Sequence, residues 1–253
     1  MSSYGNQWFA SSGSATPNFY DYEIEQSARF DRDTPSSMNF TPSSAGDRNV
    51  WTFSVWVKLS EQYNYADRGN YDTMILNAGS TGAYGTRFRI YLYDDQLRTS
   101  SATANHNISS GKYRDTSAWY HFVTKNNSGT VVQYVNGTQV SSESLGDTAI
   151  NNNVKHVLGA RDTPTTDAAM DGYMAEAIFI DGTALNPTSF AETKNGIWVP
   201  KNPSSLTFGS QGWHLKFENA SALGNDSSGN DNDWTVVNMG TDHQVLDSPT
   251  WGS

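Results

Sequence analysis

The stretch that most constrains the fold of this chain runs from Trp119 to Gly159 and reads as two successive β-hairpins. An aromatic and β-branched run (119–125) is interrupted by Asn-Asn-Ser-Gly, and a second strand-like run follows at 130–135. Asn136-Gly137 then predicts a two-residue turn, because both central positions need a positive φ and these residues tolerate it. The segment therefore predicts an antiparallel meander to which the rest of the chain must attach.

A second strong strand signal lies at Val50–Leu59. Its apolar residues alternate, with Trp51, Phe53, Val55 and Val57 directed to one face. Thr52, Ser54, Trp56 and Lys58 point to the other face, so the pattern indicates a half-buried strand of a sandwich.

Short strands of this kind recur along the chain between turn signals, and no helical pattern is long enough for a crossover. The fold class predicted is all-β, an antiparallel two-sheet sandwich. We expect an irregular N-terminal arm over residues 1–24 and a single domain over 25–253. The other predicted strands cover 28–30, 74–78, 86–93, 96–101, 171–181, 212–217 and 234–239, with one helical turn near Asn186-Pro187.

Composition excludes several classes of function. The net charge is −10 and lysines and arginines form no cluster, which argues against nucleic acid as a partner. The chain has no cysteine, so disulfides and thiolate metal sites are excluded. No run approaches the roughly 20 apolar residues of a membrane span, and the first residues lack the pattern of a signal peptide. We therefore expect no membrane insertion.

The N-terminal arm carries large aromatic residues, which a plain flexible tail seldom does. Trp8, Phe9, Phe19 and Tyr20 are candidates for an anchor. They either pack on the body of the domain or order against a partner, and the sequence leaves both readings open.

A polar loop between two predicted strands is rich in tyrosine. Tyr63, Tyr65, Arg68 and Tyr71 lie in it among Asn and Asp residues. Aromatic faces beside planar hydrogen-bonding groups suit carbohydrate, whereas Tyr-rich loops also suit protein partners because Tyr adds contact area at low entropy cost. A purely solvated loop is the third reading.

A loop near the C-terminus is dense in oxygen-bearing side chains. Asp226, Asn230, Asp231 and Asp233 could supply ligands to calcium, which takes six to eight oxygens. The alternative is that Asp and Ser-Gly build Asx-turns. Calcium is therefore an optional ligand in this prediction, and no cofactor is required. Asp94-Asp95 is a second pair, for which a turn is the alternative.

Catalytic patterns are missing. Retaining glycosidases need two carboxylates about 5 Å apart, but Glu176 has no partner two or four residues away, and Asp181 points to the opposite face of its strand. His121 and His156 lie in strands and are predicted to be hydrogen-bonded core residues. The sequence predicts a structural Glu176 and no enzyme.

The order of motifs resembles a known family. RNVWTFSVWVK (48–58), WYHFV (119–123), VVQYVNGTQV (131–140), HVLGA (156–160) and GYMAEAIFIDGTALNPTSF (172–190) are similar to the laminin-G/pentraxin-like branch of the concanavalin A-like jelly rolls. The resemblance implies that the sandwich is a two-sheet antiparallel jelly roll and that residues 25–253 form a single lectin-like domain. In this family a strand ending in D-x-S-G-x-x-N lies near the N-terminus, whereas the equivalent here is at 217–234. That displacement amounts to a circular permutation and requires neighbouring chain ends.

Other segments resemble tail-fibre and capsid-appendage domains of marine bacteriophages, namely residues 27–58, FIDGTALNPTSFAE (179–192), GIWVPK, DSSGNDNDWTV and the closing VLDSPT. This resemblance implies a non-enzymatic virion structural protein on the particle surface, in contact with other virion proteins and assembled as a homo-oligomer such as a trimer. The alternatives are a glycan-binding adhesin that recognises host surface glycans and, third, a divergent glycosidase.

Overall fold

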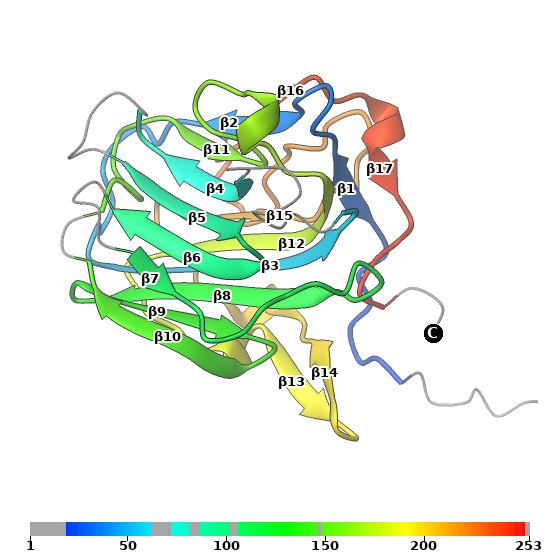
Figure 1. Ribbon diagram of the computed structural model, residues 1–253, viewed down its shortest axis with the longest axis horizontal. Coiled ribbons are helices and arrows are strands. Elements are labelled where there is room, and N and C mark those ends of the chain that lie inside the picture. Colours follow the sequence, from blue (N-terminus) through cyan, green and yellow to red (C-terminus); the bar gives the residue numbers. More distant parts are fainter. Residues whose placement is uncertain (1–18, 62–71, 81–86, 102–105, 146–147, 251–253) are drawn as a thin grey trace, which may run out of the picture.

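The computed structural model describes residues 19–61, 72–80, 87–101, 106–145 and 148–250. Two large antiparallel sheets pack face to face, as Figure 1 shows. The predicted all-β jelly-roll sandwich is therefore confirmed. The helices in these ranges are single turns, and none of them could cross a membrane.

The first sheet has the strand order β10-β9-β8-β3-β12-β1-β17, and β15 also pairs with β12. The predicted hairpins around Asn136-Gly137 form its outer strands. Its members are β1 (Ser27–Phe30), β3 (Val50–Leu59), β8 (Tyr120–Asn127), β9 (Thr130–Val135), β10 (Thr138–Ser144), β12 (Gly172–Asp181), β15 (Trp213–Leu215) and β17 (Gln244–Val245).

The second sheet has the order β16-β2-β11-β4-β5-β6-β7. It consists of β2 (Ser37–Phe40), β4 (Thr73–Ala78), β5 (Phe88–Tyr93), β6 (Gln96–Ser101), β7 (His106–Ile108), β11 (His156–Leu158) and β16 (Thr235–Val237). A separate hairpin pairs β13 (Ala191–Lys194) with β14 (Ile197–Pro200), and the single-turn 3₁₀ helices are η1 (Thr166–Ala168), η2 (Pro187–Ser189), η3 (Pro203–Ser205) and η4 (Thr241–His243).

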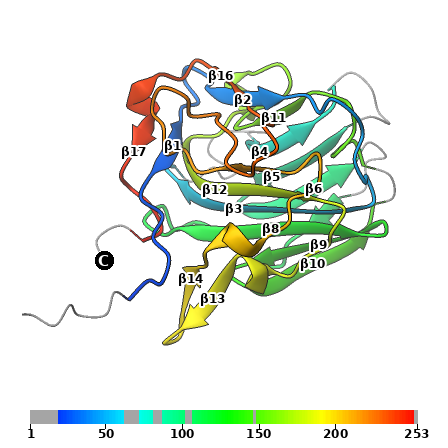
Figure 2. The same ribbon diagram turned by 180° about the vertical axis from the view of Figure 1, so that it is seen from behind.

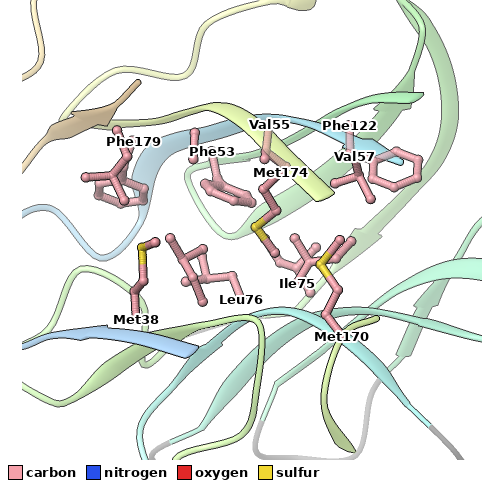
Figure 3. Close-up of a cluster of buried hydrophobic side chains, with 14 of the residues drawn as sticks. Met38, Phe53, Val55, Val57, Ile75, Leu76, Phe122, Met170, Met174 and Phe179 are labelled. Atoms are coloured by element: carbon pink, nitrogen blue, oxygen red, sulfur yellow. The ribbon is translucent and has the colours of Figure 1, made fainter. Parts of the chain in front are cut away.

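The main hydrophobic core fills the space between the two sheets (Figure 3). Phe53, Val55 and Val57 of β3 point inward, as their alternation predicts, and meet Ile75 and Leu76 from the facing sheet. Full burial of each large apolar side chain stabilises the fold by roughly 1.5–3 kcal/mol, so this core is the main source of stability.

The tight turns follow the predicted chemistry. Asn136 and Gly137 have φ of 47° and 80°, as the first hairpin turn requires. Asp94 and Asp95 also adopt positive φ, 51° and 61°, and connect β5 to β6. The turn interpretation of Asp94-Asp95 is therefore confirmed.

The outer face of the first sheet is covered, which corrects the expectation of a half-buried β3. Thr52, Ser54 and Trp56 are buried beneath the segment that follows β12 and contains the β13–β14 hairpin (Figure 2). The polar members are paired: the Thr52 hydroxyl donates to the carbonyl of Thr183 and accepts from the N–H of Leu185. A third layer therefore lies on this sheet.

The two described ends of the chain lie side by side. β1 pairs with β17, and Thr250 Oγ1 both accepts from the N–H of Ile24 and donates to its carbonyl, at 2.9 Å each. Asp247 accepts further bonds from Lys58 Nζ and Trp119 Nε1. The neighbouring ends that the permuted motif order requires are present.

Candidate functional site

The candidate site forms where two strands share one edge of β12. β1 pairs with residues 172–174, and β15 pairs with residues 177–179. Between these two pairings the register with β3 shifts, and Glu176 lies in the resulting bulge with φ of 48°. Bulges redirect side chains, and this one places a carboxylate at the junction between β1 and β15.

Glu176 is buried and both of its oxygens are bonded. Oε2 lies 2.7 Å from His214 Nε2, and Oε1 accepts from the Tyr22 hydroxyl at 2.9 Å. His214 comes from β15 and Tyr22 from the segment before β1. The predicted bond from Glu176 to a neighbouring strand is present, and its partner is His214 of β15.

Tyr22 is a hydrogen-bond donor at all ordinary pH values. Burial, and next the negative charge of Glu176, raise the pKa of its phenol well above the usual range. Its ring packs beside Ile24, Trp56, Ala175 and their neighbours. The N-terminal segment is therefore held on the sheet through residues 22–24.

The predicted calcium loop, residues 226–233, holds the backbone of His214 in place. Asp226 Oδ1 accepts from the N–H groups of His214 and Ser228, and its Oδ2 accepts from the Ser228 hydroxyl and the N–H of Asn232. The bond from the Ser228 N–H is an Asx-turn, so that alternative is confirmed for Asp226. This loop also brings Ser227 and Ser228 beside His214.

The other predicted calcium ligands take structural positions in the same loop. Asp233 Oδ1 accepts from the N–H of Asp226, and Asn230 Nδ2 donates to the carbonyls of Gly209 and Gly212. Asp231 is exposed, with φ of 56°. Among the described residues no three His, Asp or Glu side chains converge as a metal site, and calcium at this loop stays a prediction.

Two cavities open beside this junction. The first, of about 450 Å³, is here named the serine-lined cavity. The second, of about 200 Å³, is named the glutamate-lined cavity. The serine-lined cavity is bounded by Tyr22, Asn202, Pro203, Ser204, Leu206, Phe208, His214, Lys216, Ser227 and Ser228. The glutamate-lined cavity is bounded by Tyr22, Glu23, Ile24, Glu25, Gln26, Glu176, Lys216 and Glu218.

The serine-lined cavity combines an aromatic face with hydroxyl groups. The rings of Phe208 and His214 stack with centroids 5.9 Å apart and planes 14° apart. Ser204, Ser227 and Ser228 line the same space. The lining is mainly polar, with Phe208 and Leu206 as its apolar part, so this cavity can hold a polar molecule with one apolar face.

The predicted binding residues Tyr63, Tyr65, Arg68 and Tyr71 lie outside the described residues, as do Trp8 and Phe9 of the arm. Phe19 and Tyr20 are described, with their rings edge-to-face at 5.0 Å. Lys194 of β13 lies 5.8 Å from the Phe19 ring and 2.8 Å from Asp21. This part of the predicted arm therefore contacts the β13–β14 hairpin.

His121, His156 and Asp181 are hydrogen-bonded within the fold. The Trp198 indole donates to Nδ1 of His121, whose Nε2 bonds Ser54 Oγ, while His156 bonds the N–H of Asn151 and the carbonyl of Val154. Both rings are buried, as predicted. Burial lowers the pKa of His121 to about 3 and that of His156 to about 4. Asp181 accepts bonds from Asp47, Asn151 and Gln211.

Sequence reasoning missed Tyr22, His214 and Phe208 as parts of one site. Tyr22 and Glu176 are 154 positions apart, and His214 and Glu176 are 38 positions apart. No local motif links them. The one available signal is the alternation at 212–217, which places His214 and Lys216 on the face opposite to Trp213 and Leu215.

Comparison with known proteins defines the class. Residues 33–191 match the family model described as the concanavalin A-like lectin/glucanases superfamily, in its laminin G group. The chain belongs to this superfamily. The matched region contains Glu176 but ends before His214 and begins after Tyr22.

A solved structure from Bacteroides ovatus has the same fold at low sequence identity. A candidate carbohydrate-binding protein from Bacteroides ovatus is 13% identical, with a TM-score of 0.55, over 90% of this chain and 62% of that one. A heptameric SAP-like pentraxin from Limulus polyphemus is 12% identical, with a TM-score of 0.49, over 65% of this chain and 80% of that one. No curated protein sequence matches the chain significantly.

Proposed function

We propose that this chain is a non-enzymatic, lectin-like domain that binds a neutral glycan in the serine-lined cavity. The observation that carries this proposal is the stacked Phe208–His214 face beside Ser204, Ser227 and Ser228. A sugar ring has an apolar face and a rim of hydroxyls, and the two kinds of lining group match these two features.

The absence of catalysis is part of the proposal. Glycoside hydrolysis uses two carboxyl groups, about 5–5.5 Å apart in retaining enzymes and about 6.5–9.5 Å apart in inverting ones. Both oxygens of Glu176 are held by Tyr22 and His214. Asp181, the next acid along β12, is occupied by bonds to Asp47, Asn151 and Gln211. These contacts favour a structural over a catalytic Glu176.

The biological setting is proposed from the sequence resemblance. Residues 27–58 and 179–192 resemble bacteriophage appendage domains, which supports a virion surface protein that contacts other virion proteins and forms a homo-oligomer such as a trimer. The net charge of −10 supports the exclusion of nucleic acid as a partner. In this setting the glycan would belong to the host surface, which unites the virion and adhesin hypotheses.

The test is a glycan-binding screen on the full chain, run with calcium and with a chelator. Binding of a neutral glycan that is lost in Phe208→Ala supports the proposal. Loss of binding on chelation would mean that calcium at the 226–233 loop takes part in glycan binding. In that case Asp226→Asn should also abolish glycan binding. Binding that survives Phe208→Ala but not Tyr65→Ala or Tyr71→Ala would move the site to the predicted tyrosine loop. Hydrolysis that Glu176→Gln removes would refute the non-enzymatic assignment.

A further inference from the structure

Tyr22 borders both cavities. It lines the serine-lined cavity and the glutamate-lined cavity, and among the residues that bound either of them it shares this position only with Lys216. A third, small cavity of about 10 Å³ is also bounded by Tyr22, together with Glu176 and Trp56. Tyr22 is therefore common to the three spaces around the Glu176 bulge.

The Tyr22 side chain is held in this position by specific contacts. Its hydroxyl donates to Glu176 Oε1 at 2.9 Å, and its ring packs in the cluster of Ile24, Trp56 and Ala175. The backbone two residues later is fixed by the bonds between Ile24 and Thr250. Lys216, the other residue that borders both cavities, is held less firmly. Its ammonium is 3.8 Å from Glu218, and its side chain is 37% exposed.

The two cavities differ in charge. The serine-lined cavity has hydroxyl and aromatic groups with one ammonium, from Lys216. The glutamate-lined cavity is bounded by four carboxylates, those of Glu23, Glu25, Glu176 and Glu218, with the same single ammonium. Like charges within a few ångströms repel, so an anionic sugar unit would be disfavoured there, whereas neutral hydroxyls could donate to the carboxylates.

On this basis, and resting on the proposed glycan-binding function, we propose that Tyr22 is a specificity-determining residue. Its ring limits the ligand to a short neutral unit held in the serine-lined cavity. Without the ring, the site extends past Glu176 into the glutamate-lined cavity and accepts a longer neutral glycan, but not one that places an anionic unit beyond position 22.

The experiment is calorimetric titration of the full chain with neutral gluco-, xylo- and arabino-oligosaccharides of increasing length. We expect the affinity of the unmodified protein to stop rising at a short length and Tyr22→Phe to give the same profile, because the ring remains. In Tyr22→Ala the affinity should continue to rise, with about tenfold tighter binding of the longer members, the effect of one or two added hydrogen bonds. Oligogalacturonates should gain nothing.

The outcomes separate the two proposals. Equal length profiles in the unmodified protein and Tyr22→Ala would overturn the role of Tyr22 and leave the glycan site standing. An equal gain for the oligogalacturonates would overturn the selection by charge. If no variant bound any oligosaccharide, the proposed function would fail and this inference with it. Tyr22→Leu, which keeps an apolar contact with the cluster, gives the same test if Tyr22→Ala does not fold.

Discussion

His214 Nε2 donates a hydrogen bond of 2.7 Å to Glu176 Oε2, across the two strands that meet at the β12 bulge. The other oxygen of Glu176 accepts from Tyr22, so both oxygens of this buried side chain have a hydrogen-bond partner. These contacts offset the backbone strain of a non-glycine residue with positive φ, so Glu176 can be retained inside the central strand β12.

The first prediction concerns this network. Glu176→Gln should lower the free energy of unfolding by about 1.5–3 kcal/mol, because the variant replaces charge-assisted hydrogen bonds with neutral ones. Urea unfolding measures the change. Glu143→Gln, in the exposed edge strand β10, is the matched control and should alter stability by less than about 0.5 kcal/mol. Equal stability of the two variants would show that the network does not hold the bulge.

The second prediction is a loss of stability in mild acid. Trp198 donates to Nδ1 of His121, so protonation of that nitrogen breaks a buried bond. The pKa of His121 is about 3 in the folded chain and that of His156 about 4, against 6.5 for the exposed side chain. The unfolded state therefore binds more protons below pH 6.5, and stability is full above this pH and falls towards the folded pKa values.

Within this window each histidine should contribute a slope of about 1.4 kcal/mol per pH unit. Urea unfolding between pH 7 and pH 5 measures it, since most carboxylates stay ionised there. His121→Gln should reduce the slope. A flat profile in the unmodified protein would contradict the assignment of buried neutral histidines.

The third prediction compares two glycines with similar backbone conformations. Gly129 and Gly137 have φ of 89° and 80°, but a Cβ at Gly129 meets nothing within 4 Å, whereas one at Gly137 would lie 2.7 Å from the Trp198 ring. Gly129→Ala should cost about 1–2 kcal/mol of backbone strain. Gly137→Ala should cost about 1–3 kcal/mol more than Gly129→Ala, which is the usual effect of overpacking. Similar melting temperatures for the two variants would mean that Trp198 moves away without cost.

The fourth prediction concerns the junction of the chain ends. Thr250→Val should destabilise the fold by about 1–3 kcal/mol, because it leaves the buried N–H and carbonyl of Ile24 without their partner. Thr250→Ser keeps the hydroxyl and should restore most of the loss. Thermal unfolding of both variants measures the effect. If valine and serine behaved alike, the hydroxyl bonds would not secure the N-terminal segment.

The contact between Ile24 and Thr250 also sets where the arm can be cut. Deletion of residues 1–24 would remove Tyr22 and the buried Ile24, so a test of particle attachment should remove residues 1–18 instead. We expect that variant to fold and to fail to join phage particles if the arm is the anchor. Full attachment by the shortened chain would contradict the anchor hypothesis.

Much of the fold could be predicted from sequence because its signals are local. Asn136-Gly137 specifies a turn, and the alternation of Trp51, Phe53, Val55 and Val57 specifies the core face of β3. The covering of the other face was not predictable in this way, because Thr52 and Ser54 look like solvent-facing residues until their partners are known. These partners are Thr183 in the segment after β12 and His121 in β8.

The candidate site could not be predicted for a related reason. Its members come from three distant segments, and the bulge that turns Glu176 towards them depends on two strands sharing one edge of β12. Asp226 was singled out for its oxygens, but the structure uses them to fix His214. The pattern indicated a polar loop correctly, while its role depends on tertiary contacts.

The most direct test of the central claim is calorimetric titration of the neutral glycan that binds best in the screen, into the unmodified protein, Phe208→Ala and Tyr93→Ala. Tyr93, a half-buried aromatic residue of β5 in the opposite sheet, is the matched control. We predict that Phe208→Ala weakens binding at least about tenfold, the effect of losing one aromatic contact, while Tyr93→Ala binds normally. Unchanged affinity in Phe208→Ala, or no glycan binding by the unmodified protein, would contradict a glycan site in the serine-lined cavity.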